Sequence, residues 1–232
     1  MITDDVYFIF KNISSENYLG IKKLPSIFKA EKDISLIEVE GRDGFLTQDL
    51  GSYRSIVKTV ECIIKDLSQI DFICSWLSGS GEVIFSNEPD KIYKATIKNQ
   101  IEFTQLVSTY DYHEFIIQFE CQPHKYSLTN NLITLITTPQ TIVNSGSASS
   151  KPIIKVFGTG AITLTVNSNI VSLTNISEYI IIDSEMMDAY KGSSLCNNQM
   201  YGDFPILEVG NNAISFTGTV TSIEITPNFC YL

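Results

Sequence analysis

The stretch from Tyr179 to Pro227 decides the fold class, and it reads YIIIDSEMMDAYKGSSLCNNQMYGDFPILEVGNNAISFTGTVTSIEITP. Short runs rich in Ile, Val, Phe and Thr alternate there with turns that contain Gly, Asn and Ser, a pattern typical of consecutive β-strands. The stretch contains no nucleophile–base pair and no metal-ligand motif. It therefore predicts a module that builds a sheet surface and lacks an evident reaction centre.

The rest of the second half continues this pattern. Turn residues at Gly158–Gly160, Asn167–Asn169, Gly210–Asn212 and Gly218 separate short apolar runs. The strands we expect are Ile153–Phe157, Ala161–Val166, Ile170–Leu173, Tyr179–Asp183, Ile206–Val209, Ala213–Thr217 and Val220–Thr226. Evenly spaced short strands of this kind are typical of a sandwich or jelly roll.

A Ser-, Gly- and Thr-rich connection, TTPQTIVNSGSASSK at 137–151, separates the two halves. We expect one domain over 1–138 and a second over 139–232. In the first, DLSQIDFICSWLSG (Asp66–Gly79) has apolar residues at helical spacing. The strands expected around this helix are Ser35–Glu40, Ser55–Ile64, Glu82–Phe85, Tyr93–Lys98 and Tyr110–Cys121. The sequence thus predicts a mainly β protein, with a β-sandwich-like first domain and one packed helix.

Composition excludes several classes of function. The chain has 232 residues, of which 44% are hydrophobic and 18% charged, so a sizeable core is expected. A formal net charge of −10 argues against nucleic-acid binding, which needs clustered Lys and Arg. The five cysteines are spread widely without a CxxC motif, which indicates free thiols in a reducing compartment.

The first residues, MITDDVYFIFKN, do not resemble a secretion signal, because two acids stand where such signals carry positive charge. No stretch approaches the ~20 apolar residues of a membrane span. We therefore expect a chain that is made in the cytoplasm and does not insert into a membrane.

The residues that could take part in catalysis or metal binding are more simply interpreted as structural or solvent-exposed. Asp183, Glu185 and Asp188 lack the spacing of a calcium loop, and a solvated acidic turn is the favoured interpretation over catalysis or metal binding. His113 and His124 have no second ligand or nucleophile at a meaningful spacing. The sequence thus predicts no cofactor, no metal and no enzymatic activity.

Gly41-Arg42-Asp43-Gly44 follows the expected strand Ser35–Glu40 and precedes the segment FLTQDLGSY. Asp-Gly favours a tight hairpin turn, in which glycine accepts a positive φ. A phosphate-binding loop would need more glycines and a helix directly after it. The tip is therefore either idle or a contact to a neighbouring subunit, and both interpretations stay open.

Exposed aromatic rings are the usual means by which β modules bind sugars. Tyr190 and Tyr201 lie in the long connection between expected strands of the second half and are the candidates for such a contact. The second half contains no tryptophan.

The order of these signals resembles that of the distal tail proteins of siphophages and of prophage-encoded tail particles. The first half is similar in its VEGRDG turn, the GSYRSIVKTVECII segment, the helix that leads into WLSGSGEVIFSNEPDKIYKATI, and FIIQFECQPHKYSL. The second half is similar in NSGSASSKPIIKVFGTGAITLTVN, the IIIDSE strand and GDFPILEVGNNAISFTG. The resemblance covers almost the whole chain.

This resemblance implies a hexameric ring at the tip of the tail, assembled in the cytoplasm of the host bacterium. One face of the ring would meet the tail-tube protein, and the other the tail-associated lysin or fibre protein. The second domain would be a galectin-like jelly roll that holds a receptor-binding protein or a host cell-wall sugar. The candidate ring contacts are Gly41, Arg42, Asp43, Gly44, Phe45 and Tyr53. The alternative function is a carbohydrate-binding accessory module, with an enzyme of unfamiliar type as a more distant one.

Overall fold

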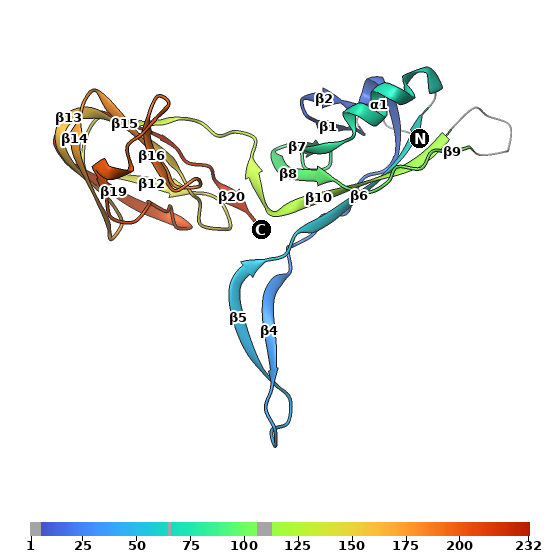
Figure 1. Cartoon of the computed structure of the whole chain (residues 1–232), viewed down its shortest axis with the longest axis horizontal. Coiled ribbons are helices and arrows are strands. Elements are labelled where there is room, and N and C mark those ends of the chain that lie inside the picture. The colour runs from blue at the N-terminus through green and yellow to red at the C-terminus, as the bar shows by residue number, and fades with distance from the viewer. Residues whose placement is uncertain (1–5, 65, 106–112) are drawn as a thin grey trace. The chain divides into compact units, whose positions relative to one another are not determined.

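The computed structural model describes residues 6–64, 66–105 and 113–232 (Figure 1). The chain forms two compact units: unit 1 runs to Leu128 and includes Leu232, and unit 2 is Thr129–Tyr231. Both are built from β-sheets, which confirms the mainly β fold class. The boundary expected at 138/139 falls after strand β11 (Ile133–Leu135), which pairs with β19 (Gly210–Thr226) of unit 2.

Unit 1 contains one large antiparallel sheet. Its strands are β1 (Phe8–Phe10), β2 (Ile13–Ser14), β3 (Leu19–Lys23), β6 (Ile56–Ile64), β7 (Gly79–Phe85), β8 (Lys91–Ile97), β9 (Thr104–Gln105) and β10 (His113–Ser127). They are ordered β2-β1-β7-β8-β10-β6-β3, and β9 also pairs with β10. A 3-10 turn, η1 (Ser15–Asn17), connects β2 to β3.

The predicted strands of the first half correspond to parts of this sheet and of the hairpin described below. Residues 110–112 of the expected strand Tyr110–Cys121 lie outside the described residues. Alternation along β6 and β10 places one side of each strand in the core, as period-2 patterning requires. No sequence pattern predicted β1, β2, β3 or β9.

Aromatic side chains fill the core of unit 1. The Phe119 ring meets Phe8, Phe10 and Phe85 edge-on, at centroid distances of 5.4, 5.4 and 5.6 Å. Trp76 stacks on Phe8 at 5.6 Å, and its indole N–H donates to the Phe10 carbonyl at 2.9 Å. Such edge and stacked pairs add to the stabilisation that burial provides.

The predicted helix is shorter than Asp66–Gly79. It begins as a 3-10 turn, η2 (Leu67–Gln69), and continues as α1 (Ile70–Trp76). Asp66 accepts a hydrogen bond from the Ser68 amide at 2.9 Å, as expected for a helix cap. Leu67 is exposed because it lies in the 3-10 turn and not on the buried side of α1.

Strands β4 (Lys32–Glu38) and β5 (Phe45–Tyr53) form a separate two-stranded sheet in unit 1. Within the described residues they pair only with each other, and Figure 1 shows them as one long hairpin. We call residues 32–53 the arm.

Unit 2 is built around two long strands, β13 (Ile153–Val166) and β19. Besides these and β11, it contains β12 (Gln140–Asn144), β14 (Asn169–Ile176), β15 (Tyr179–Asp183), β16 (Asp188–Lys191), β17 (Ser194–Leu195), β18 (Met200–Tyr201) and β20 (Cys230–Tyr231), with a 3-10 turn η3 (Asn197–Gln199). β13 and β19 pair along most of their length. The first part of β13 pairs with β15 and its second part with β14, while β19 pairs with β12 near its start and β11 near its end. The β13–β19 ribbon therefore contributes to both layers of a sandwich.

The turns expected at Gly158–Gly160 and Gly218 are wrong: both segments lie inside these long strands. The β13–β19 register shifts there, between Phe157 and Ile162. A Cβ on Gly158 would lie 2.3 Å from the Thr219 carbonyl oxygen, and one on Gly218 would lie 2.4 Å from that of Ala161. Glycine is required here because the β13 and β19 backbones approach closely where the register of the pair shifts.

The strand expected at Ile206–Val209 is also absent. Only Leu207 bridges, exchanging both backbone hydrogen bonds with Ser150 at 2.9 and 3.0 Å. The buried Asn212 side chain instead bonds both the amide and the carbonyl of Glu208, at 2.7 and 2.8 Å. A side chain thus takes the hydrogen bonds that a neighbouring strand would provide.

We expect Gly218→Ala to destabilise unit 2 by at least about 2 kcal/mol, because it combines a backbone clash with a φ of 100°. Gly160→Ala is the matched control: its φ is 78°, but nothing lies within 4 Å of the added Cβ. Urea unfolding followed by circular dichroism would report both units, whereas Trp76 fluorescence reports unit 1. Equal losses in the two variants would contradict the close-approach argument.

Candidate functional site

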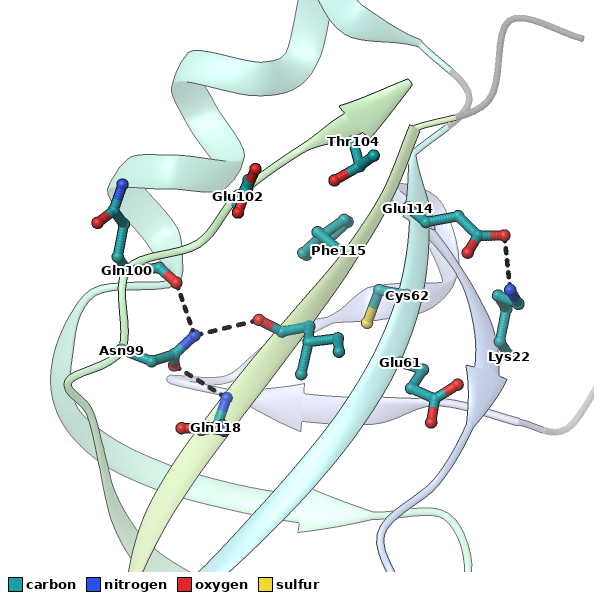
Figure 2. Close-up of a pocket in the computed structure, with 11 residues that line it drawn as sticks. Lys22, Glu61, Cys62, Asn99, Gln100, Glu102, Thr104, Glu114, Phe115 and Gln118 are labelled. Carbon is teal, nitrogen blue, oxygen red and sulfur yellow. Dashed lines mark hydrogen bonds and ion pairs between the residues drawn. The ribbon is translucent and has the colours of Figure 1, made fainter. Parts of the chain in front are cut away.

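A cavity of about 500 Å³ lies on unit 1 beside β10 (Figure 2). Lys22 on β3 and Glu114 on β10 form an ion pair of 2.5 Å at its edge. The Asn99 side chain donates to the Ile116 carbonyl at 3.1 Å and accepts from the Gln118 amide at 2.9 Å. Asn99 thus continues the pairing of β10 beyond the end of β8.

The chemistry of this cavity does not suit catalysis. Cys62 is its one thiol among the described lining residues, and burial raises the pKa of that thiol, which keeps it protonated and unreactive. Glu61 and Glu102 also line this cavity, but its described lining residues include no histidine. The described lining residues therefore contain no nucleophile–base pair.

The arm offers a different kind of site, because apolar side chains cover both of its sides. Directly opposite residues of an antiparallel pair share a face, and successive residues alternate between faces. The register pairs Leu36 with Thr47, Ile37 with Leu46, and Glu38 with Phe45. Ile34, Leu36 and Phe45 therefore lie on one side, which we call face one. Ile37, Leu46 and Leu50 lie on the other, which we call face two.

These apolar residues are unusually accessible. On face one Leu36 is 56% and Phe45 55% exposed, and on face two Ile37 is 42% and Leu46 39% exposed. Scattered exposed apolar residues are ordinary, but six of them gathered on one ribbon mark an interaction surface. An isolated two-stranded hairpin is also only marginally stable in water. We therefore expect the arm to bind a partner that buries these apolar side chains.

The tip of the arm carries four of the predicted interface residues together. Gly41 and Gly44 each have a φ of 79°, as the predicted tight turn requires. The Arg42 amide donates to the Val39 carbonyl at 3.1 Å, and Asp43 lies between the two glycines and is exposed. Within the described residues, the Arg42 guanidinium has no ion-pair partner.

Phe45 adjoins the tip, whereas Tyr53 lies at the opposite end of β5, at the root of the arm. The Tyr53 ring contacts His124 of β10 edge-on, with centroids 5.9 Å apart. Arg54 and Asp33 form an ion pair of 3.0 Å beside it. The structure thus brings Gly41–Phe45 together and separates them from Tyr53.

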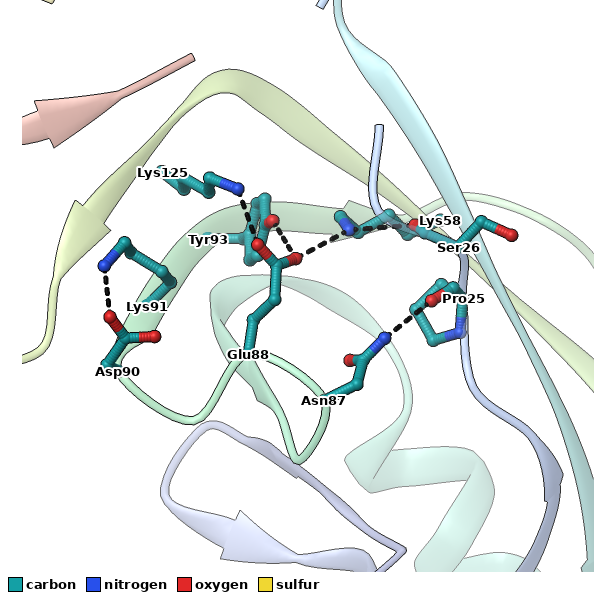
Figure 3. A network of polar contacts seen from close by, with 9 residues as sticks. All are labelled: Pro25, Ser26, Lys58, Asn87, Glu88, Asp90, Lys91, Tyr93 and Lys125. Carbon is teal, nitrogen blue, oxygen red and sulfur yellow. Dashed lines mark hydrogen bonds and ion pairs between the residues drawn. The ribbon is translucent and has the colours of Figure 1, made fainter. Parts of the chain in front are cut away.

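A buried polar network holds the root of the arm (Figure 3). Glu88, in the turn between β7 and β8, forms ion pairs with Lys58 of β6 at 3.3 Å and with Lys125 of β10 at 2.5 Å. It also accepts a hydrogen bond from the Tyr93 hydroxyl. Lys58 is fully buried and lies 4.5 Å from the centre of the Tyr93 ring. Glu88 therefore joins three strands of unit 1.

The same network fixes the chain on its way into the arm. The Lys58 ammonium donates to the Ser26 carbonyl at 3.3 Å, and the Asn87 amide donates to the Pro25 carbonyl at 2.9 Å. The segment that precedes β4 and the strand that follows β5 are thus held by neighbouring residues of one turn. This determines where both ends of the arm leave the sheet.

Burial and pairing compete in setting the pKa values of this network. Burial acts to raise the pKa of Glu88, but hydrogen bonds from Lys125 and Tyr93, together with attraction to the Lys58 and Lys125 charges, outweigh it, so the pKa lies below its ordinary value. Burial lowers the pKa of Lys58, and the Glu88 carboxylate opposes this only in part. Glu88 is therefore needed to keep a buried ammonium charged.

We expect Glu88→Gln to destabilise unit 1 by about 3 kcal/mol, since it leaves the Lys58 ammonium buried without a counter-charge. Trp76 fluorescence during urea unfolding measures the change. The matched control is Glu61→Gln, which removes the partner of Lys23 in the same unit, where the Lys23 and Glu61 side chains are 68% and 40% exposed. No shift is expected in the control, because exposed ion pairs contribute little.

The stabilisation from Glu88 should also depend on pH. Because its folded pKa lies below the ordinary 4.5, this contribution is complete above that pH and is lost as the pH falls through the folded pKa. The stability difference between the natural chain and Glu88→Gln should therefore shrink on acidification. A difference that is constant between pH 7 and pH 3 would show that the Glu88 charge is not what stabilises unit 1.

The two tyrosines proposed for sugar contact do not share a strand pair. Tyr190 lies on β16, which pairs with β15, and is half-buried. Tyr201 lies on β18, which pairs with β14, and is 60% exposed. Of the two, Tyr201 offers the more accessible ring.

Asp183 and Asp188 hold the local structure of unit 2 through hydrogen bonds, and Asp183 is not solvated as the sequence predicted. Asp183 is buried and accepts from the amides of Glu185 and Met186, each at 3.0 Å, which closes the β15–β16 turn. Asp188 accepts from the Asn197 side chain at 2.9 Å. In the described residues, no three His, Cys, Asp or Glu side chains could together hold a metal ion.

The remaining predictions about single residues concern histidine, cysteine and membrane insertion. His113 is buried in β10, and His124 lies in the same strand. All five cysteines are free, as expected. No helix among residues 6–64, 66–105 and 113–232 combines the length and hydropathy that a membrane span needs.

The apolar faces of the arm and the network at its root were not predicted from the sequence. A signal for the network was present: Lys58 stands at an inward position of the β6 alternation, where a charge needs a buried partner. Nothing in the sequence identified Glu88 as that partner. The apolar residues of the arm look like ordinary strand residues in the sequence. Only the fold shows that no other strand of the described part of unit 1 pairs with β4 and β5.

The structure and the sequence both resemble those of phage tail proteins. The fold is similar to the crystal structure of Dit (gp 19.1) of phage SPP1, described as a paradigm of the hub adsorption apparatus in phages that infect Gram-positive bacteria. The TM-score is 0.76 at 15% identity, over 95% of this chain and 97% of that chain. No curated protein sequence matches significantly. Residues 6–121 match the family described as phage tail protein RIFT-related domain. The chain therefore belongs to this family of structural phage tail proteins, as the resemblance in its sequence indicated.

Proposed function

We propose that this protein is the distal hub of a phage or phage-like tail and that six copies form a ring joined through their arms. The observation that carries the proposal is the arm, an accessible ribbon with apolar residues on both sides and a firmly held root. The likeness of the fold to SPP1 Dit supports the hub role. A closed ring needs two different complementary patches on each subunit, and an arm that reaches a neighbour can supply one of them.

The proposed partners follow from this position. One side of the ring would meet the tail-tube protein and the other the tail-associated lysin or fibre protein. Unit 2 would hold a receptor-binding protein or a host cell-wall sugar, for which Tyr201 and, less accessibly, Tyr190 are the candidate contacts. The site of action would be the virion tail, after assembly in the bacterial cytoplasm.

We expect Phe45→Asp to abolish ring assembly, because it places a charge in an apolar contact, while unit 1 stays folded. Light scattering gives the solution mass, negative-stain images show the ring, and Trp76 fluorescence checks the fold. The matched control is Ile170→Asp in unit 2, which changes a residue of similar exposure, 59% against 55%, outside the arm. Arg42→Glu tests the tip separately: assembly that survives this change would exclude Arg42 from the contact.

Two outcomes would overturn the ring. If Phe45→Asp and Ile170→Asp reduce assembly equally, the arm is not the specific contact. A mass of one chain at every concentration, also with tail-tube protein added, would contradict the ring itself. If that monomer were also stabilised by cell-wall polysaccharide, by about 2.7 kcal/mol at a hundredfold excess over the dissociation constant, a carbohydrate-binding module would be favoured instead.

A further inference from the structure

The outer side of the β14 layer of unit 2 is a sheet face rich in hydroxyl groups. Directly opposite residues of antiparallel strands share a face, so the register identifies the rows that cross it. One row runs across β19, β13, β14 and β18 and consists of Thr217, Thr163, Ser172 and Tyr201. The next row consists of Ser215, Thr165 and Ile170. We call the residues of these two rows the hydroxyl face.

The Tyr201 ring stands at one end of the first row, on a strand that is held firmly against β14. Tyr201 is 60% exposed, whereas its neighbour Met200 is buried in the core of unit 2. On the other side, a Cβ on Gly202 would lie 2.4 Å from the Ile170 carbonyl oxygen, so the two backbones lie in close contact there. The ring is therefore positioned before any ligand arrives, which reduces the entropy that binding costs.

The cationic side chains of unit 2 belong to other parts of its fold. Residues 129–231 contain no arginine, and their lysines are Lys151, Lys155 and Lys191. Lys151 precedes β13, Lys155 lies in the part of β13 that pairs with β15, and Lys191 lies on β16. The acid nearest to Tyr201 along the chain is the exposed Asp203. The hydroxyl face thus offers hydroxyl groups and an aromatic ring without a cation, which disfavours an anionic polymer as its ligand.

An uncharged saccharide matches this chemistry. Its hydroxyl groups can exchange hydrogen bonds with water for hydrogen bonds to serine and threonine side chains. The apolar side of a sugar ring can cover the Tyr201 ring, which is broad and apolar on its faces. A protein partner matches less well, because serine and threonine seldom contribute much to the energy of protein–protein contacts, and Ile170 is the one aliphatic residue of the face.

We propose that the hydroxyl face binds an uncharged cell-surface polysaccharide. Tyr201 stacks on a sugar ring, and Ser172 and Thr163, which follow it in the same row, form hydrogen bonds with the sugar hydroxyl groups. Tyr190 is not part of this site, because it lies on β16 in the β15 layer. The proposal rests on the proposed function, in which unit 2 meets the host surface, and it specifies the class of ligand and the face that binds it. A ring would present the face many times, so that weak binding by each copy adds up.

Isothermal titration of the natural chain with short uncharged oligosaccharides of glucose, galactose, rhamnose and N-acetylglucosamine tests the site. We expect at least one of these sugars to bind. Tyr201→Ala should weaken that binding by about tenfold or more, the loss typical of a central aromatic contact. Tyr201→Phe keeps the ring and should retain most of the binding. Circular dichroism checks that unit 2 stays folded in each variant.

Tyr190→Ala is the matched control, because it removes a tyrosine ring from the other layer of the same unit, and it should leave the affinity unchanged. Equal losses in Tyr190→Ala and Tyr201→Ala would overturn the assignment to the hydroxyl face. If none of the oligosaccharides binds, or if poly(glycerol phosphate), an anionic polymer, binds more tightly than all of them, the uncharged ligand class is wrong.

Light scattering on the same samples distinguishes failure of this inference from failure of the ring. Rings that bind none of the sugars would overturn the sugar site and leave the hub in place. A chain that binds sugar through Tyr201 but forms no ring, even with tail-tube protein added, would overturn the hub and leave the sugar site in place.

Discussion

The burial of one lysine constrains unit 1 more than any other single feature. Lys58 occupies a core position of β6, so its ammonium must find a counter-charge inside the protein. Glu88 supplies it from the β7–β8 turn and at the same time binds Lys125 and Tyr93. Because Lys58 also bonds the Ser26 carbonyl, the requirement to satisfy one buried charge fixes the chain on both sides of the arm.

This constraint matters because the arm has little stability of its own. Its two strands pair only with each other among the described residues, and its apolar side chains are accessible on both faces. A ribbon of this kind gains stability when a partner buries it. Holding its root rigidly reduces the conformational entropy that binding would otherwise cost. The buried network thus holds the root of the arm, and the exposed faces offer the surface that a partner would bury.

In unit 2 the main constraint is different, because two long strands run through both layers of a sandwich. The β13–β19 ribbon does so where Gly158 and Gly218 let the backbones approach, and the register shifts at that place. The sequence contained these glycines, but glycine between two apolar runs is compatible with a turn as well as with an irregularity inside a strand. The choice depends on which strands lie alongside, which is a property of the fold.

The mainly β fold, the helix near Asp66 and the glycine turn at the tip of the arm could be predicted from the sequence, because each depends on residues close together in the chain. The family could be predicted as well, from the order of segments along almost the whole chain. The alternation of β6 also recorded that Lys58 points inward. The tertiary structure was needed to show that Glu88 is the partner of Lys58 and that, among the described residues, no strand pairs with the arm. These facts join residues distant in the chain, or concern what does not pack against a strand, and local patterns carry neither.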